Sequence, residues 1–121
     1  EEQLYAQLVT DGELEEAWFK LEVAEMLAAA GPWGQGFPEP TFHGDFSVVQ
    51  HRRVGANHLK LVLRSSSNFP ELFDAIAFNI DEEDWPKDNI ESMRIVFRLD
   101  INEYRSVRRL QLLIQYIIEM N

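Results

Sequence analysis

The stretch SMRIVFRLDI (residues 92–101) alternates between apolar and polar side chains along most of its length. One face of the stretch is entirely apolar and consists of Ile95, Phe97, Leu99 and Ile101. The other face is mostly charged and consists of Arg94, Val96, Arg98 and Asp100. Side chains of a β-strand point alternately to its two sides, so this period of two predicts a strand with one face in a core.

The same β-type pattern recurs on both sides of this stretch. HLKLVLR (residues 58–64) places its leucines on one face, and the turn-forming GAN (residues 55–57) separates it from a β-prone segment at 46–54. Residues 72–80 predict a further strand, and residues 110–118 predict the last one. The apolar face of this last strand is expected to consist of Leu110, Leu112, Ile114 and Tyr116.

The segments between the strands indicate how the strands are arranged. Residues 65–71 and 102–109 are polar and predict loops, whereas DEEDWPKD (residues 81–88) suits a short helix or turn capped by Asp81. Three strands, a short helix and two more strands is the layout of the OB-fold, a five-stranded Greek-key barrel. A sandwich usually has more strands, and a parallel sheet needs real helices between its strands. The sequence therefore predicts a mainly β protein with an OB-fold.

An N-terminal helix and a linker are predicted before the barrel. Residues 13–30 are acidic in their first turns, with Thr10 and Asp11 available as N-caps, and Gly31 can end the helix. The apolar stripe of this helix is expected to include Leu14, Trp18, Leu21 and Met26. GPWGQGFPEP (residues 31–40) is too rich in glycine and proline for a helix or a central strand. We expect an acidic helix and linker from a preceding domain at 1–40, and the OB-fold domain at 41–121.

Composition narrows the class of protein. The chain has 121 residues, a net charge of −10 and no cysteine, which excludes a disulfide scaffold and a thiolate metal site. We see no membrane span or signal peptide and expect a cytoplasmic protein. Because residue 1 is not methionine, we interpret the chain as part of a longer protein. Residues 1–45 hold ten acidic residues and one lysine, whereas residues 46–121 hold eleven acidic and ten basic residues.

The clustered basic residues predict a surface for nucleic acid. OB-folds bind ligands on the face of their second and third β-strands and on the loops beside it. A protein that binds single-stranded nucleic acid needs cations for the phosphates and flat groups on which bases stack. His51, Arg52 and Arg53, at the end of the first predicted strand, also lie near this ligand-binding surface. The candidate contacts are Lys60, Arg64, Arg94, Arg98, Tyr104, Arg105, Arg108 and Arg109. The structural alternative is that these arginines solvate a barrel face and pair with Glu91, Asp100 and Glu103.

Catalysis and metal binding find little support in the residues. The acidic run at 81–84 lacks the spaced ligands and the glycine of a calcium loop, and a solvated helix start explains it. His43 and Asp45 match no metal-binding spacing. Trp18 and Trp33 are interpreted as packing residues, and Trp85 as a plug at one end of the barrel. We predict no catalytic residue, no metal site and no cofactor in this chain, and we do not expect it to be an enzyme in its own right.

Several separated motifs resemble the RecJ family of single-strand-specific exonucleases, in its C-terminal OB-fold part. They are GPWGQGFPEP at 31–40, FHGDF at 42–46, DAIAFN at 74–79 and LDINEYR at 99–105. The resemblance implies a bacterial enzyme of recombination and repair that degrades single-stranded DNA from 5′ to 3′. It also implies Mn²⁺ or Mg²⁺ in an N-terminal nuclease domain, whose Asp-His-His motif is absent here. The OB domain is then expected to grip the single strand beside that nuclease domain.

Two functions remain open from the sequence. In the first, the domain binds single-stranded DNA, with the cations on phosphates and Tyr104 stacked on a base. In the second, it is a protein-interaction module that docks an acidic peptide, such as the tail of a single-strand-binding protein, or the parent's own domains. Both partners are anionic, so charge alone does not separate them. The acidic N-terminal part is expected to weaken DNA binding.

Overall fold

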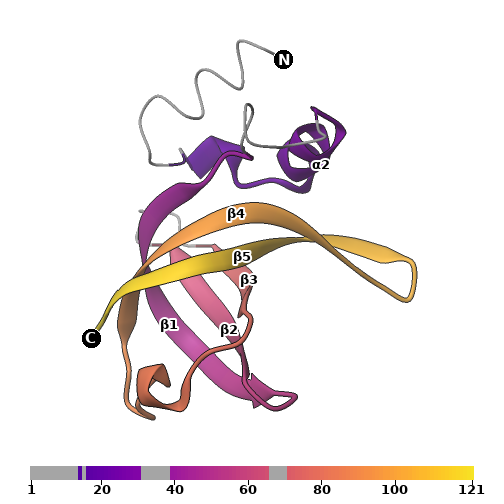
Figure 1. The fold of residues 1–121 in the computed structure, drawn as a ribbon. Coiled ribbons are helices and arrows are strands. Elements are labelled where there is room, and N and C mark those ends of the chain that lie inside the picture. The colour runs from indigo at the N-terminus through magenta and orange to yellow at the C-terminus, as the bar shows by residue number, and fades with distance from the viewer. Residues whose placement is uncertain (1–13, 15, 31–38, 66–70) are drawn as a thin grey trace.

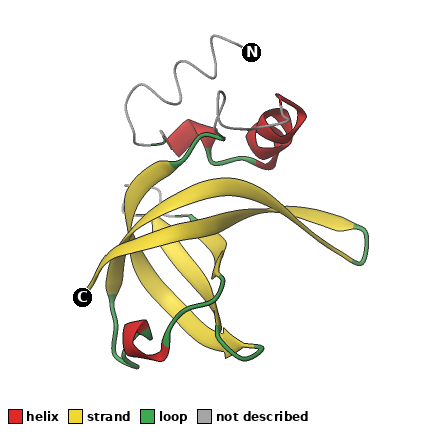
Figure 2. Ribbon diagram, in the orientation of Figure 1, coloured by secondary structure: helices red, strands yellow, loops and turns green. Residues whose placement is uncertain are grey.

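The computed structural model describes residues 14, 16–30, 39–65 and 71–121, and its body is a closed β-barrel (Figures 1 and 2). The strands are β1 (Phe42–Val54), β2 (His58–Ser65), β3 (Leu72–Ala77), β4 (Ser92–Tyr104) and β5 (Val107–Met120). Around the barrel they follow the order β1-β2-β3-β5-β4, and β4 pairs with β1 to close it. Only β3 and β5 pair in parallel among the strands described. The predicted five-stranded OB-fold is confirmed.

Along β2 and β4, burial alternates from residue to residue, as the sequence pattern predicted. Leu59, Leu61 and Leu63 of β2 are at most 1% exposed, and Ile95, Phe97 and Leu99 of β4 are buried in the same core. Every second side chain of a strand points into the interior of a barrel. A sequence pattern with a period of two therefore separates inward-facing from outward-facing residues. The GAN turn also forms as predicted, with Gly55 at φ 64°, a conformation that glycine adopts without strain.

A segment before the barrel closes its upper end. The ring of Phe19 lies among those of Phe46, Phe73 and Phe97, at centroid distances of 6.2, 4.9 and 5.7 Å. The helix α2 (Leu21–Ala30) lies against β4 and β5 and buries Val23, Ala24 and Leu27 (Figure 1). The part of the N-terminal segment that the structure describes therefore packs on the barrel core. The predicted division at residue 40 stays a prediction.

The N-terminal helix is shorter than predicted. Residues 16–18 form a 3₁₀ turn, η1 (Glu16–Trp18), and α2 begins only at Leu21. Phe19 lies in the break, where it packs into the barrel, so tertiary packing replaces a continuous helix. The expected stripe is correct for Leu14 but wrong for Met26, which is 38% exposed, because the break shifts the helical phase. The predicted caps at Thr10, Asp11 and Gly31 and most of the linker lie outside the described residues.

Two strands end differently from the prediction. β1 begins at Phe42 rather than at residue 46, because residues 42–47 pair with β4 and close the barrel. β3 ends at Ala77 rather than at residue 80, and Asn79 leaves the strand with φ 57°. The expected short helix is η2 (Glu82–Asp84), and Asp81 stands at its start without a side-chain capping bond.

The predicted polar loop at 102–109 is wrong. β4 and β5 continue as paired strands to Tyr104 and Val107, joined by a two-residue turn of Arg105 and Ser106. Both turn residues have positive φ, 52° and 66°, as in the tight turns that match the twist of a hairpin. We call residues 102–109 the arm, and Figure 1 shows it projecting beyond the barrel. Solvent reaches both faces of such an extension, which explains the polar sequence.

The apolar face predicted for the last strand is wrong at Tyr116. Phe97 pairs with Ile114 and Val96 with Tyr116, so Gln115 is an extra residue in β5. This bulge reverses the facing of the residues that follow, since an extra residue shifts the alternation by one. Ile117 consequently packs against the core, and Tyr116 is 70% exposed.

Candidate nucleic-acid interface

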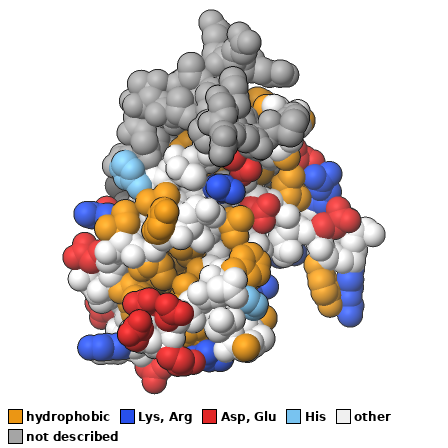
Figure 3. Space-filling view, in the orientation of Figure 1, with side chains coloured by type: hydrophobic (Ala, Val, Ile, Leu, Met, Phe, Trp, Pro, Cys, Tyr) orange, Lys and Arg blue, Asp and Glu red, His pale blue; other side chains and the backbone are white. Residues whose placement is uncertain are grey.

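A basic groove lies between the outer face of the barrel and the arm. Its volume is about 650 Å³, and its lining consists of Arg52, Lys60, Asp74, Asn102, Tyr104, Arg105, Val107 and Arg109. The lining has four cations against a single carboxylate, although the whole chain carries a net charge of −10. Figure 3 shows the arm standing away from the body, with basic side chains on it and a recess beside it.

Strand register brings the cations of the barrel wall together. Lys60 lies between the buried Leu59 and Leu61 and therefore points outward. Its partner on β1 is Arg52, directly across the β1–β2 ladder. On β3, Ile76 pairs with Lys60, and Asp74 lies two residues before Ile76 on the same outer face. The barrel wall thus contributes two neighbouring cations to the groove.

The arm contributes the other wall. Asn102 and Arg109 are opposite each other in the β4–β5 ladder, and Tyr104 and Val107 flank the turn. Tyr104 is 66% exposed, and the guanidinium carbon of Arg105 lies 5.2 Å from the centroid of the Tyr104 ring. A phenol ring beside a guanidinium offers two flat surfaces on which a base can stack.

Half of the predicted contact residues meet in this groove. They are Lys60, Tyr104, Arg105 and Arg109. Arg52 also lines the groove, although it was not among the predicted contacts. The sequence does contain a signal for the position of Arg52, because a turn at 55–57 implies a hairpin register in which Arg52 lies opposite Lys60.

The other four predicted cations lie outside the groove lining. Arg64 is exposed at the far end of β2, opposite Ser47 and Leu72. The Nε of Arg98 is buried and has no hydrogen-bond partner within the described part of the chain. The remaining two, Arg94 and Arg108, form ion pairs. DNA contact by any of these four stays a prediction.

Both ion-paired arginines bind carboxylates of other elements. The Nε of Arg94 donates to Asp45 Oδ1 at 2.7 Å, and this hydrogen bond, together with the carboxylate charge, raises the pKa of Arg94. Arg108 Nη1 lies 3.2 Å from Oε2 of Glu25 in α2, and Arg108 Nε lies 3.8 Å from Oε1 of Glu103 in the arm. The structural alternative, in which arginines pair with acidic residues, therefore applies to Arg94 and Arg108, but of the predicted partners only Glu103 is among the carboxylates that these two arginines bind.

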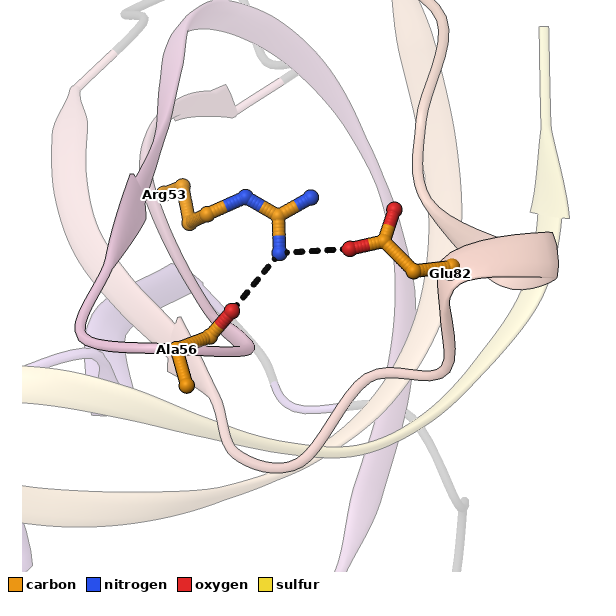
Figure 4. Close-up of polar contacts among 3 residues, drawn as sticks. All are labelled: Arg53, Ala56 and Glu82. Atoms are coloured by element: carbon orange, nitrogen blue, oxygen red, sulfur yellow. Dashed lines mark hydrogen bonds and ion pairs between the residues drawn. The ribbon is translucent and has the colours of Figure 1, made fainter.

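A third arginine fixes the loop at the lower end of the barrel. Arg53 Nη1 donates to the carbonyl oxygen of Ala56 at 2.8 Å and lies 2.9 Å from Glu82 Oε1 (Figure 4). Its guanidinium carbon also lies 3.8 Å above the ring of Trp85. Trp85 is half-buried and packs against the core, in agreement with its predicted role as a plug. Arg53 thus ties the β1–β2 turn to η2.

Replacing Arg53 with alanine is expected to lower the free energy of unfolding by about 1–2 kcal/mol, because a cation–π contact and a hydrogen bond are lost together. Chemical denaturation followed by tryptophan fluorescence measures this change. Arg52→Ala is the matched control, since it removes the neighbouring charge from the groove and not from this contact. Equal stability losses in the two variants would contradict the role of Arg53.

One group of carboxylates among the described residues lies close enough together to be considered for a metal ion. Asp81, Glu83 and Asp84 bring carboxylate oxygens within 4.8 Å of one another, but all three residues are exposed at one short 3₁₀ turn. Solvated acidic residues at a helix start need no ion to explain them. His43 and Asp45 are both exposed on β1, and Asp45 is engaged by Arg94. No helix among the described residues is long and apolar enough to cross a membrane.

Known proteins of one kind match this chain. The relative from Haemophilus influenzae, named single-stranded-DNA-specific exonuclease RecJ, is 46% identical over 119 residues, which is 97% of this chain and 20% of the relative. The protein of the same name from Escherichia coli K12 is 45% identical over 114 residues, or 94% of this chain and 20% of the relative. The chain spans about a fifth of the length of these relatives.

A solved structure and a family match agree with these relatives. The crystal structure of RecJ in complex with Mg²⁺ from Thermus thermophilus is similar over 90% of this chain and 16% of that one, with a TM-score of 0.62 and 20% identity. At this identity the likeness concerns the fold. The family described as RecJ OB domain matches residues 10–116, which include every strand of the barrel except the end of β5. The chain therefore belongs to the RecJ OB domain family.

Proposed function

We propose that this domain binds single-stranded DNA in the basic groove and positions it for a nuclease domain elsewhere in a RecJ-type parent protein. The observation that carries the proposal is the groove itself, where four cations and an exposed tyrosine gather on an acidic molecule. Single strands bind in cationic channels that follow the backbone and provide rings for the bases.

Each part of the groove has a role in this proposal. Arg52 and Lys60 on the barrel wall, and Arg109 on the arm, neutralise phosphates from two sides. Tyr104 stacks on a base, and Arg105 beside it extends the stacking surface or binds a phosphate. No base edge has to be read in this arrangement, so binding is expected to tolerate any sequence.

The names of the relatives support the wider role. They are called single-stranded-DNA-specific exonucleases, and this chain spans about a fifth of their length. We assign the hydrolysis of DNA, and the Mn²⁺ or Mg²⁺ it would use, to the remainder of the parent. The exposed carboxylates at 81–84 do not fit such an ion. A C-terminal position in the parent, action in recombination and repair, and a cytoplasmic location in bacteria belong to the same proposal.

A second candidate is the docking of an acidic peptide, such as the tail of a single-strand-binding protein, or of the parent's own domains. Val107 favours it, because this apolar side chain is 52% exposed and lines the groove beside the cations. A peptide with both acidic and apolar residues would match that surface.

Tyr104→Ala separates the two candidates. If a base stacks on this ring, the variant is expected to lose about 1–3 kcal/mol of affinity for oligo(dT), since each stacked base contributes that much. Fluorescence anisotropy of the labelled oligonucleotide measures the loss at low and moderate salt. An unchanged affinity would contradict stacking on Tyr104 and favour the peptide.

The test uses the whole 121-residue chain with substituted residues. Removing the acidic residues before Asp45 would also remove Phe19 and Phe42, whose rings pack in the barrel core. A truncated chain would therefore confuse lost folding with a gain of affinity from lost acidic charge.

A further inference from the structure

An aromatic ring stands exposed immediately after β3. Phe78 follows the last residue of that strand, Ala77, and its side chain is 51% exposed. A single exposed apolar residue is common on protein surfaces and carries no meaning alone. Phe78 is distinguished by how firmly its surroundings are held and by its position relative to the basic groove.

Several contacts hold the surroundings of Phe78. Its ring packs edge to face with the ring of His58, at 5.1 Å between centroids and 79° between planes. His58 Nδ1 in turn accepts a hydrogen bond of 3.1 Å from the backbone N–H of Asn79. The next N–H, of Ile80, donates to the carbonyl oxygen of Asn57 at 2.8 Å. The ring is thus positioned by a neighbouring ring and two backbone anchors, so stacking on it would cost little ordering entropy.

The register of β2 and β3 relates Phe78 to the groove. Ile76 pairs with Lys60, and Lys60 lines the groove. His58 lies two residues before Lys60 on the outer face of β2. Phe78 lies just beyond the end of β3, and its ring contacts the ring of His58. The two rings therefore continue the outer face of the groove past Lys60, towards the β1–β2 turn.

Charge and shape together identify the ligand that fits this extension. The adjoining cations attract a polyanion, and a half-exposed flat ring offers a stacking surface with no hydrogen-bonding groups of its own. A nucleotide of a single strand satisfies both, because its phosphate is charged and the face of its base is apolar and flat. Tyr104 supplies one ring on the arm, and Phe78 supplies another at the barrel end.

We propose that Phe78, held in place by His58, is a second stacking position for a base of the strand that occupies the basic groove. This inference rests on the proposed binding of single-stranded DNA and adds a residue and a direction to it. The strand then runs from the arm, over Arg52 and Lys60, to the β1–β2 turn.

Two oligonucleotides of equal length test the proposal, one of oligo(dT) and one made only of abasic sites. Phe78→Ala is expected to weaken binding of oligo(dT) about tenfold. The same variant should leave the affinity for the abasic strand and the salt dependence of binding unchanged, because no cation is removed. Tyr116→Ala is the matched control, since it removes a ring that is 70% exposed on β5 and does not line the groove.

Each other outcome has a distinct meaning. An equal loss on both strands, or no loss on either, overturns the stacking role of Phe78 while leaving the groove in place. If the unsubstituted chain binds neither strand at low salt, the proposed function itself fails. Should Phe78→Ala unfold the chain, Phe78→Leu keeps apolar packing against His58 without a flat ring, and it is expected to give the same selective loss on oligo(dT).

Discussion

Replacing Arg52 and Lys60 together with alanine is expected to lower the affinity for short oligo(dT) about 50-fold at roughly 50 mM salt. The two side chains are cross-strand neighbours that line the basic groove, so one strand of DNA can contact both. Each phosphate contact with a single strand contributes about 0.7 to the slope of log affinity against log salt. Loss of two contacts should therefore reduce the slope by about 1.4, and the affinities should converge near 1 M salt.

Anisotropy titrations at several salt concentrations measure both quantities. Lys87→Ala is the control, because it removes an exposed positive charge that lines a different recess, beside η2. Arg64→Ala asks a second question, since Arg64 was a predicted contact and lies outside the groove lining. A loss with Arg64→Ala as large as with the double variant would show that the binding surface is wider than the groove. An unchanged slope in the double variant would refute phosphate binding by Arg52 and Lys60.

Phe97→Ala is expected to lower the free energy of unfolding by about 3–5 kcal/mol, the usual cost of deleting a large buried ring. Phe97 is 0% exposed, and the rings of Phe19, Phe42 and Phe46 surround it at centroid distances of 5.7, 6.1 and 5.7 Å. Small domains have a total stability of about 5–15 kcal/mol, so one substitution removes a large part of it.

Urea denaturation followed by circular dichroism measures this loss. Tyr116→Ala removes a ring of similar size from the exposed side of β5, and its effect is expected to stay within about 0.5 kcal/mol. Because Phe19 precedes α2 and packs on Phe97, the variant should also loosen the packing of α2 on the barrel. A loss below about 1 kcal/mol would mean that the aromatic cluster does not hold the barrel together.

The parts of the fold that the sequence predicted correctly are those encoded by short-range patterns. The alternation at 58–64 and 92–101 identified two strands and the inner face of each, since a period of two depends only on neighbouring residues. The GAN turn, the short helix near Asp81 and the order of elements then indicated the OB-fold. Lys60 was placed outward by the same alternation, and it does line the groove.

The errors arose where a distant contact decides the local structure. The break before α2 depends on the packing of Phe19 among rings from β1, β3 and β4. The exposure of Tyr116 depends on an extra residue in β5, which is visible only against the partner strand. The arm has a loop-like composition, and pairing of its two strands across a turn with positive φ makes it a hairpin.

The sequence by itself determined that this chain is a five-stranded barrel, which residues at 58–64 and 92–101 face its core, and the resemblance to the RecJ family. Only the tertiary structure decided which cations share one surface. Arg53, Arg94 and Arg108 are engaged by carboxylates from other elements, whereas Arg52, Lys60, Arg105 and Arg109 line one groove. The physical reason is that burial alternates along a single strand, but a charge acquires its partners through register, twist and loop geometry that join residues far apart in the chain.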